Sequence, residues 1–129
     1  MVLSLDITPS IPLGRQIIQS YGDYRFKISD KIYEAPILVF PDEIIPWAVN
    51  SIDDLSATSI RAVIEAKPSV EIFLVGCGTS IRLIQPAIRD ELKIAGIAIE
   101  SMDTGAACRT FNVLTTEDRR VAAALIPVE

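Results

Sequence analysis

The first third of the chain alternates between apolar and polar positions with the period of β-strands. Three short strands are expected here, over 15–21, 24–28 and 31–34. Gly22-Asp23, between the first two, is a pair typical of tight turns. In the second strand the alternation places Tyr24, Phe26 and Ile28 on one face. The pattern therefore predicts an antiparallel β part at the N-terminus.

From residue 35 onward the pattern changes to short, nearly continuous apolar runs, which are typical of strands buried on both faces. Four such strands are expected, over 35–40, 71–75, 96–100 and 121–126. Stretches with apolar residues at helical spacing lie between them, and helices are expected over 57–66, 86–95 and 104–114. Ser56 can cap the first helix, Pro86 suits the first turn of the second, and Asp103 or Thr104 can cap the third.

Strands that alternate with helices predict right-handed βαβ units and a parallel sheet. We therefore predict an α/β fold. A single three-layer domain over 1–129 would contain a parallel sheet of about four strands alternating with three helices, in addition to the N-terminal antiparallel β part. No internal repeat, low-complexity tract or long linker divides the sequence.

Composition narrows the chemistry that this fold can carry. The chain has 129 residues, of which 50% are hydrophobic and 22% charged, so it can bury a core without metals or disulfides. It contains no histidine, which excludes Ser–His and Cys–His catalytic pairs and histidine metal ligands. The formal net charge of −5 disfavours nucleic-acid binding, which depends on clustered lysine and arginine.

The two cysteines, Cys77 and Cys108, have neither CxxC nor zinc-type spacing, so no metal site is expected. Cys77, in a strand-to-loop bend, is the better-placed nucleophile, but either thiol can simply be a small buried side chain. The N-terminus lacks the features of an export signal, and the longest uncharged stretch, 72–81, is about half the length of a membrane span. A cytoplasmic protein with two free thiols is expected.

Glycine and hydroxyl side chains gather where the predicted parallel strands end, and ligands bind at that edge of open α/β sheets. Gly76 and Gly78 follow one strand and invite a dinucleotide-binding interpretation. Ile81 occupies the third glycine position, however, and Pro86 starts the helix several residues late. No cofactor is therefore expected.

A denser polar cluster follows the next strand, and its candidate ligand-binding residues are Asp103, Thr104, Arg109 and Asn112. Together with Gly76 and Gly78 they could form an anion site, in which Arg109 and the helix start supply the positive charge. Alternatively, Arg109 is structural and is directed toward a nearby backbone carbonyl or a carboxylate, such as Glu100 or Glu117. In that case Arg109→Ala would cost about 2–4 kcal/mol. In either case the 76–80 loop should pack against the 102–105 turn.

Residues 32–60 carry five acidic residues and no basic one, which suggests either a solvated face or a docking patch for a protein. Asp42, Glu43 and Trp47 are the candidate partner-binding residues in this stretch. Trp47 could instead anchor its loop to the sheet. The two neighbouring carboxylates alone do not indicate a magnesium site or acid–base catalysis.

The stretches GCGTS and ESMDTGAACRTFNVLTTEDRRVAAALIP resemble the family that contains the mitochondrial NADH dehydrogenase (complex I) assembly factor three and uncharacterised bacterial and archaeal relatives. The likeness spans nearly the whole chain, and Phe111 stands where the family usually has tyrosine. The resemblance implies a compact three-layer α/β domain. For the mitochondrial members it implies a non-enzymatic role in complex I assembly, exercised through protein partners.

The sequence therefore leaves two hypotheses about function. The leading hypothesis is a non-enzymatic protein-binding and assembly module, linked by resemblance to respiratory NADH dehydrogenase assembly, with protein partners, no nucleic acid and no membrane span. The alternative is a small-molecule or anion-binding protein, with or without enzyme activity, whose site lies at the C-terminal ends of the parallel strands. A solvent-connected pocket lined by the polar cluster would favour the alternative.

Overall fold

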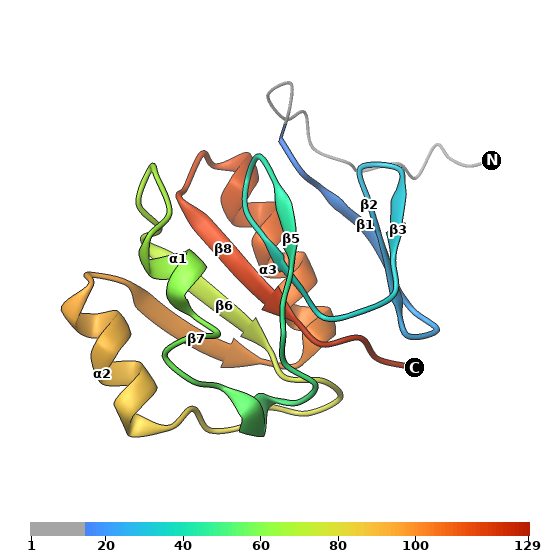
Figure 1. The fold of residues 1–129 in the computed structure, drawn as a ribbon. Helices are drawn as coiled ribbons and strands as arrows, with labels where there is room; N and C mark the ends of the chain where they lie inside the picture. The colour runs from blue at the N-terminus through green and yellow to red at the C-terminus, as the bar shows by residue number, and fades with distance from the viewer. Residues whose placement is uncertain (1–14) are drawn as a thin grey trace.

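The computed structural model describes residues 15–129, which form two β-sheets and three α-helices (Figure 1). The strands are β1 (Ile18–Gly22), β2 (Arg25–Ile28), β3 (Lys31–Tyr33), β4 (Ile37–Val39), β5 (Ile44–Pro46), β6 (Ile72–Gly76), β7 (Ala98–Met102) and β8 (Val121–Leu125). The helices are the 3-10 turn η1 (Ile52–Asp54) and the α-helices α1 (Arg61–Ile64), α2 (Pro86–Ile94) and α3 (Thr104–Thr116). The α/β fold class with an antiparallel N-terminal part is confirmed. A single domain over 1–129 stays a prediction, and residues 1–14 lie outside the described range.

Strands β1, β2 and β3 form a small antiparallel sheet. The first turn is Asp23-Tyr24, one residue later than expected, and both residues have positive φ (53° and 58°), as a type I′ hairpin requires. Phe26 and Ile28 are fully buried, but Tyr24 is 59% exposed because it belongs to the turn rather than to the strand. The prediction that Tyr24 lies on one strand face with Phe26 and Ile28 is therefore wrong.

The larger sheet has the strand order β5-β4-β8-β6-β7 and mixed direction. β6 is parallel to both β7 and β8, whereas β4 is antiparallel to β8 and to β5. The expected parallel sheet of about four strands is thus parallel only over β6, β7 and β8. An apolar run reports that a strand is buried on both faces, but it does not report the strand's direction. β4 continues into β5 through a hairpin, so no crossover helix places it parallel to its neighbours.

Strand β7 is an edge strand rather than one buried on both faces, and Ala98 and Glu100 are exposed. α2 and α3 begin where expected. A residue with positive φ, Gly96 (79°), follows α2, and the Asp103 side chain caps α3. The helix expected over 57–66 is shorter, because Ser56 and Ser59 exchange hydrogen bonds that form a turn and leave only α1 helical.

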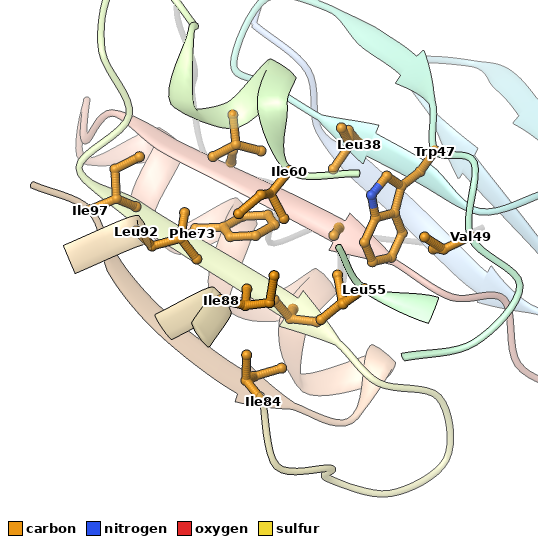
Figure 2. Packing of buried hydrophobic residues seen from close by; sticks show 14 of the residues in the cluster. Leu38, Trp47, Val49, Leu55, Ile60, Phe73, Ile84, Ile88, Leu92 and Ile97 are labelled. Carbon is orange, nitrogen blue, oxygen red and sulfur yellow. The ribbon is translucent and has the colours of Figure 1, made fainter. Parts of the chain in front are cut away.

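The core has one part on each face of the larger sheet. On one face, η1, α1 and α2 cover Leu38, Phe73 and Val75, and Trp47 and Leu92 pack among them (Figure 2). On the other face, the fully buried Phe111 of α3 packs with Val39 and Leu74, and the small sheet closes this side with Phe26 and Ile28. The larger sheet therefore lies between two helical layers, and the small sheet is attached beside α3.

Candidate functional site

The loop after β6 packs against the turn between β7 and α3, as the sequence predicts. The Cys77 backbone N–H donates to the Met102 carbonyl at 2.8 Å, and the Thr104 N–H donates to the Gly78 carbonyl at 2.9 Å. Both segments follow parallel strands, so the carboxyl ends of β6 and β7 meet at one edge of the sheet.

Thr104 joins the ends of the three parallel strands. Its side chain is fully buried, its hydroxyl accepts from the Gly78 N–H at 3.0 Å, and it donates to the Ile126 carbonyl at 2.7 Å. The hydroxyl thus connects the segments that follow β6 and β8 with the first residue of α3. The hydroxyl proton of Thr104 is therefore used in a bond within the chain.

Gly76, at the end of β6, and Gly78, in the loop, are glycines for different reasons. A Cβ atom at Gly76 would lie 3.0 Å from the Thr104 Cα, 3.1 Å from a Leu125 methyl and 3.2 Å from the Ala107 Cβ. The space over Gly76 is therefore filled by α3 and β8, and no pyrophosphate fits there. Gly78 has a φ of 102°, which side chains rarely adopt.

Asp103 and Asn112 also bond within the chain. The Asp103 carboxylate accepts from the Ala106 N–H at 2.8 Å and so forms the N-cap of α3. The Asn112 amide pairs with the backbone of Ile18, accepting from its N–H at 2.9 Å and donating to its carbonyl at 2.8 Å. Asn112 thereby attaches β1, and with it the small sheet, to α3.

Arg109 occupies a different environment from the one expected. Its side chain is exposed and donates to the Tyr21 hydroxyl at 2.9 Å, and among residues 15–129 it forms no ion pair. The expectation that Arg109 is directed toward a carboxylate such as Glu100 or Glu117, or toward a backbone carbonyl, is therefore wrong. Glu117 is eight residues further along the helix direction, about 12 Å away along the axis, and Glu100 is on the edge strand.

Tyr21 is the residue of this cluster that the sequence analysis missed. Its ring lies over Gly105, where a Cβ atom would come within 2.8 Å of the ring Cζ. Gly105 therefore leaves the space that Tyr21 occupies, and Arg109, one turn further along α3, reaches the hydroxyl. The signal available in the sequence was a glycine one turn before an arginine, but the tyrosine that both residues contact lies 88 residues before the arginine.

The three candidate partner-binding residues separate. Trp47 is only 4% exposed, and its indole N–H donates to the Ser59 carbonyl at 2.9 Å, so it anchors its loop to the core. Asp42 and Glu43 are exposed in the turn between β4 and β5.

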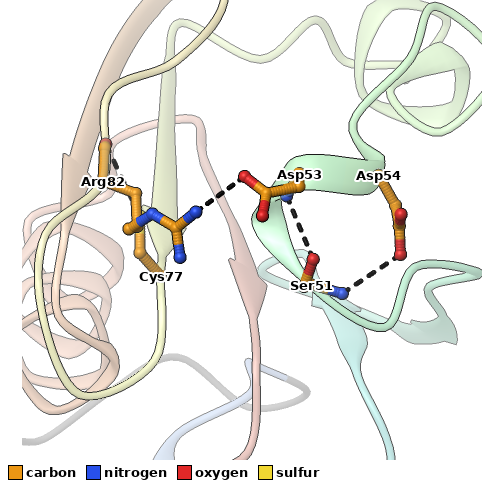
Figure 3. Close-up of polar contacts among 5 residues, drawn as sticks. All are labelled: Ser51, Asp53, Asp54, Cys77 and Arg82. Carbon is orange, nitrogen blue, oxygen red and sulfur yellow. Dashed lines mark hydrogen bonds and ion pairs between the residues drawn. The ribbon is translucent and has the colours of Figure 1, made fainter.

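A second feature of the strand ends is a tethered loop with exposed apolar side chains. Arg82 donates to an Asp53 carboxylate oxygen at 2.7 Å, and Asp53 belongs to η1, whose N-terminus is closed by a Ser51–Asp54 capping box (Figure 3). Ile84, 4% exposed, anchors the same loop in the core. Between these attachments, Ile81 is 64% exposed and Leu83 is 92% exposed. We call these two residues, with Asp53 and Asp54, the loop surface.

Both thiols are free and buried. Burial raises the pKa of Cys108 to about 12, so this thiol is protonated at neutral pH and is a poor nucleophile. Among residues 15–129, no group of three or more acidic or cysteine side chains is placed to hold a metal ion. Within that same range, none of the helices has the length and apolar character needed to cross a membrane.

Residues 18–126 match a family described as "Protein of unknown function (DUF498/DUF598)". The chain belongs to this family. The NADH dehydrogenase [ubiquinone] 1 alpha subcomplex assembly factor 3 of Danio rerio is 38% identical over 111 residues, covering 86% of this chain and 64% of that protein. An uncharacterized protein of Rhodobacter capsulatus is 34% identical, covering 89% of this chain and 87% of its own. The family resemblance inferred from the sequence is confirmed, and this chain spans slightly less than two thirds of the first-named relative.

Solved structures share the fold. A structure described as an outer membrane protein from Bartonella henselae superimposes with a TM-score of 0.83 at 34% identity, covering 90% of this chain and 98% of that one. A Bordetella pertussis protein described as a Mth938-like domain gives a TM-score of 0.79 at 26% identity, covering 92% of this chain and 89% of its own.

Proposed function

We propose that this protein is a non-enzymatic protein-binding module that assists the assembly of a respiratory NADH dehydrogenase. The observation that carries the proposal is its 38% identity to a complex I assembly factor over 86% of the chain. The polar groups of Asp103, Thr104 and Asn112 are used in contacts within the chain, which favours a structural role for them over substrate binding.

The loop surface is the contact site that we propose for the partner. Water-exposed leucine is common, but Leu83 and Ile81 stand on a loop fixed by an ion pair and by a buried isoleucine. A fixed loop loses little conformational entropy on binding. Burying each of these side chains contributes roughly 1.5–3 kcal/mol. Asp53 is already paired with Arg82, and Asp54 closes the capping box of η1, so the free contact area of the loop surface is apolar and favours a partner segment with apolar side chains.

Deleting the gene in the organism of origin tests the role. We expect loss of fully assembled NADH dehydrogenase on native gels, with restoration by the wild-type chain but not by the double variant Ile81→Ser/Leu83→Ser. Val113→Ser is the matched control, since Val113 is 56% exposed on α3, away from this loop. Normal enzyme levels in the deletion strain would refute the assembly role. Restoration by the double variant would refute the proposed contact site alone.

The partner class and location follow from the same proposal. The net charge of −5 supports a protein partner rather than DNA or RNA. A cytoplasmic location of this chain is proposed on its sequence alone. Salt-sensitive retention on immobilised nucleic acid would contradict the choice of a protein partner over DNA or RNA.

A further inference from the structure

A cavity of about 250 Å³ lies at the opposite end of the larger sheet from the loop surface, where β6 and β8 begin. It opens between the β4–β5 turn and the segment that leads from α1 to β6. Its floor is apolar and consists of Phe40, Ile45, Ala62, Ala66, Val70 and Val121. Pockets for drug-sized ligands measure roughly 300–1,000 Å³, so this one suits a smaller molecule.

The rim of the cavity carries opposite charges on its two sides. Asp42 and Glu43, in the β4–β5 turn, are exposed on one side. Lys67, before β6, and Arg119 and Arg120, before β8, line the cavity as well. Because β8 lies between β4 and β6 in the sheet, the acidic turn and the lysine are on opposite sides of it. Arg15 and Asp118 also line the rim but pair with each other.

The basic side retains donors that the chain does not use. Arg119 binds Glu71 through Nε at 2.6 Å, which leaves its two terminal nitrogens available. Arg120 donates Nε to the Ser69 carbonyl and approaches the same Glu71 carboxylate at 3.4 Å. One carboxylate thus serves two guanidinium groups. Within the part of the chain that the structure describes, the Lys67 ammonium has no partner.

We propose that this cavity binds a free α-amino acid with an apolar side chain. The side chain would lie on the apolar floor, the carboxylate would face Arg119, Arg120 and Lys67, and the ammonium would face Asp42 and Glu43. A simple anion would meet the acidic turn unpaired, and a simple amine would meet the basic side unpaired. A zwitterion complements both sides.

The test is a ¹H–¹⁵N NMR titration of the full chain with L-leucine, L-methionine and L-phenylalanine. At least one of them should shift the amide signals of residues 40–45, 66–70 and 118–121 in a saturable manner. N-acetyl-L-leucine lacks the ammonium and isoamylamine lacks the carboxylate, so each should bind more weakly than L-leucine. Each loss should be about two- to fivefold, the contribution of one exposed ion pair.

Three variants locate the site. Lys67→Gln and Glu43→Gln should each weaken binding by about two- to fivefold. Lys93→Gln is the matched control, because Lys93 is an exposed lysine on α2, outside the cavity lining. Melting curves of all three variants would verify that they fold. No saturable shift with any of the three amino acids would overturn the proposal, as would equal binding of L-leucine, N-acetyl-L-leucine and isoamylamine.

Discussion

Replacing Asn112 by alanine should weaken the attachment of the small sheet to α3. The wild-type amide makes two hydrogen bonds to the Ile18 backbone, at 2.9 and 2.8 Å. Each such bond contributes about 1 kcal/mol to the free energy of unfolding. A backbone group that loses its hydrogen bond destabilises the fold further where water cannot reach it. Ile18 is only 5% exposed, so water replaces little. We expect a loss of about 2–3 kcal/mol, which corresponds to a melting temperature lower by about 6–15 °C for a chain of this length.

Urea unfolding followed by circular dichroism measures this loss, and Arg109→Ala is its control. Arg109 lies on the same helix, but it is exposed, and within residues 15–129 its side chain bonds only to the Tyr21 hydroxyl. Its removal should therefore cost less than about 1 kcal/mol, rather than the 2–4 kcal/mol that a buried ion pair would imply. The reasoning would be refuted if Asn112→Ala changed the free energy of unfolding by less than about 0.5 kcal/mol, or if Arg109→Ala cost more than Asn112→Ala.

Three further predictions concern α3 and the start of β6. Gly105→Ala should destabilise the wild type, because the new methyl group displaces the Tyr21 ring. In a Tyr21→Ala background the same change should stabilise the fold by up to about 1 kcal/mol, because alanine favours a helix more than glycine does. Similar effects in both backgrounds would contradict the contact between Tyr21 and Gly105. Burial raises the pKa of Cys108 to about 12, so Ellman's reagent at pH 8 should modify this thiol only after unfolding. In the unfolded chain two free thiols should react. Fast modification of Cys108 in the folded chain would contradict its burial. The hydrogen bond from the Arg119 guanidinium lowers the pKa of Glu71 in the folded chain. The stabilisation that this pair contributes is therefore complete above the unfolded-state pKa of about 4.5, and it is lost as the pH falls through the pKa of the folded state. Glu71→Gln should therefore lower the free energy of unfolding at pH 7, and the difference from wild type in urea titrations should shrink as the solution is acidified.

Local signals predicted the elements that local interactions specify. Pro86 and Gly96 limit α2, and Asp103 caps α3, because a helix terminus depends on residues within one turn. The helix expected over 57–66 failed for the same reason, since two serines three residues apart bond to each other in place of a longer helix.

The sequence predicted which two segments meet at the candidate site, but not the contacts of its side chains. The 76–80 loop does meet the 102–105 turn, because successive parallel strands end at one edge. The partners of Arg109 and Asn112 are Tyr21 and Ile18, which lie more than 80 residues earlier in the chain. No spacing rule relates residues so far apart, so the choice between an ion pair and a tyrosine hydroxyl could not be made from the sequence.

The sequence by itself determined the class of the fold, the two free thiols, the absence of histidine chemistry and the family, because each depends on composition, periodicity or residue identity. The tertiary structure decided the rest. β4 runs antiparallel to β8 rather than parallel as expected, because an apolar run specifies that a strand is buried but not its direction. The tertiary structure buried Trp47 and exposed Leu83, although both are apolar residues in loops, because only the assembled sheet and helices determine which loop side chains find a core to enter.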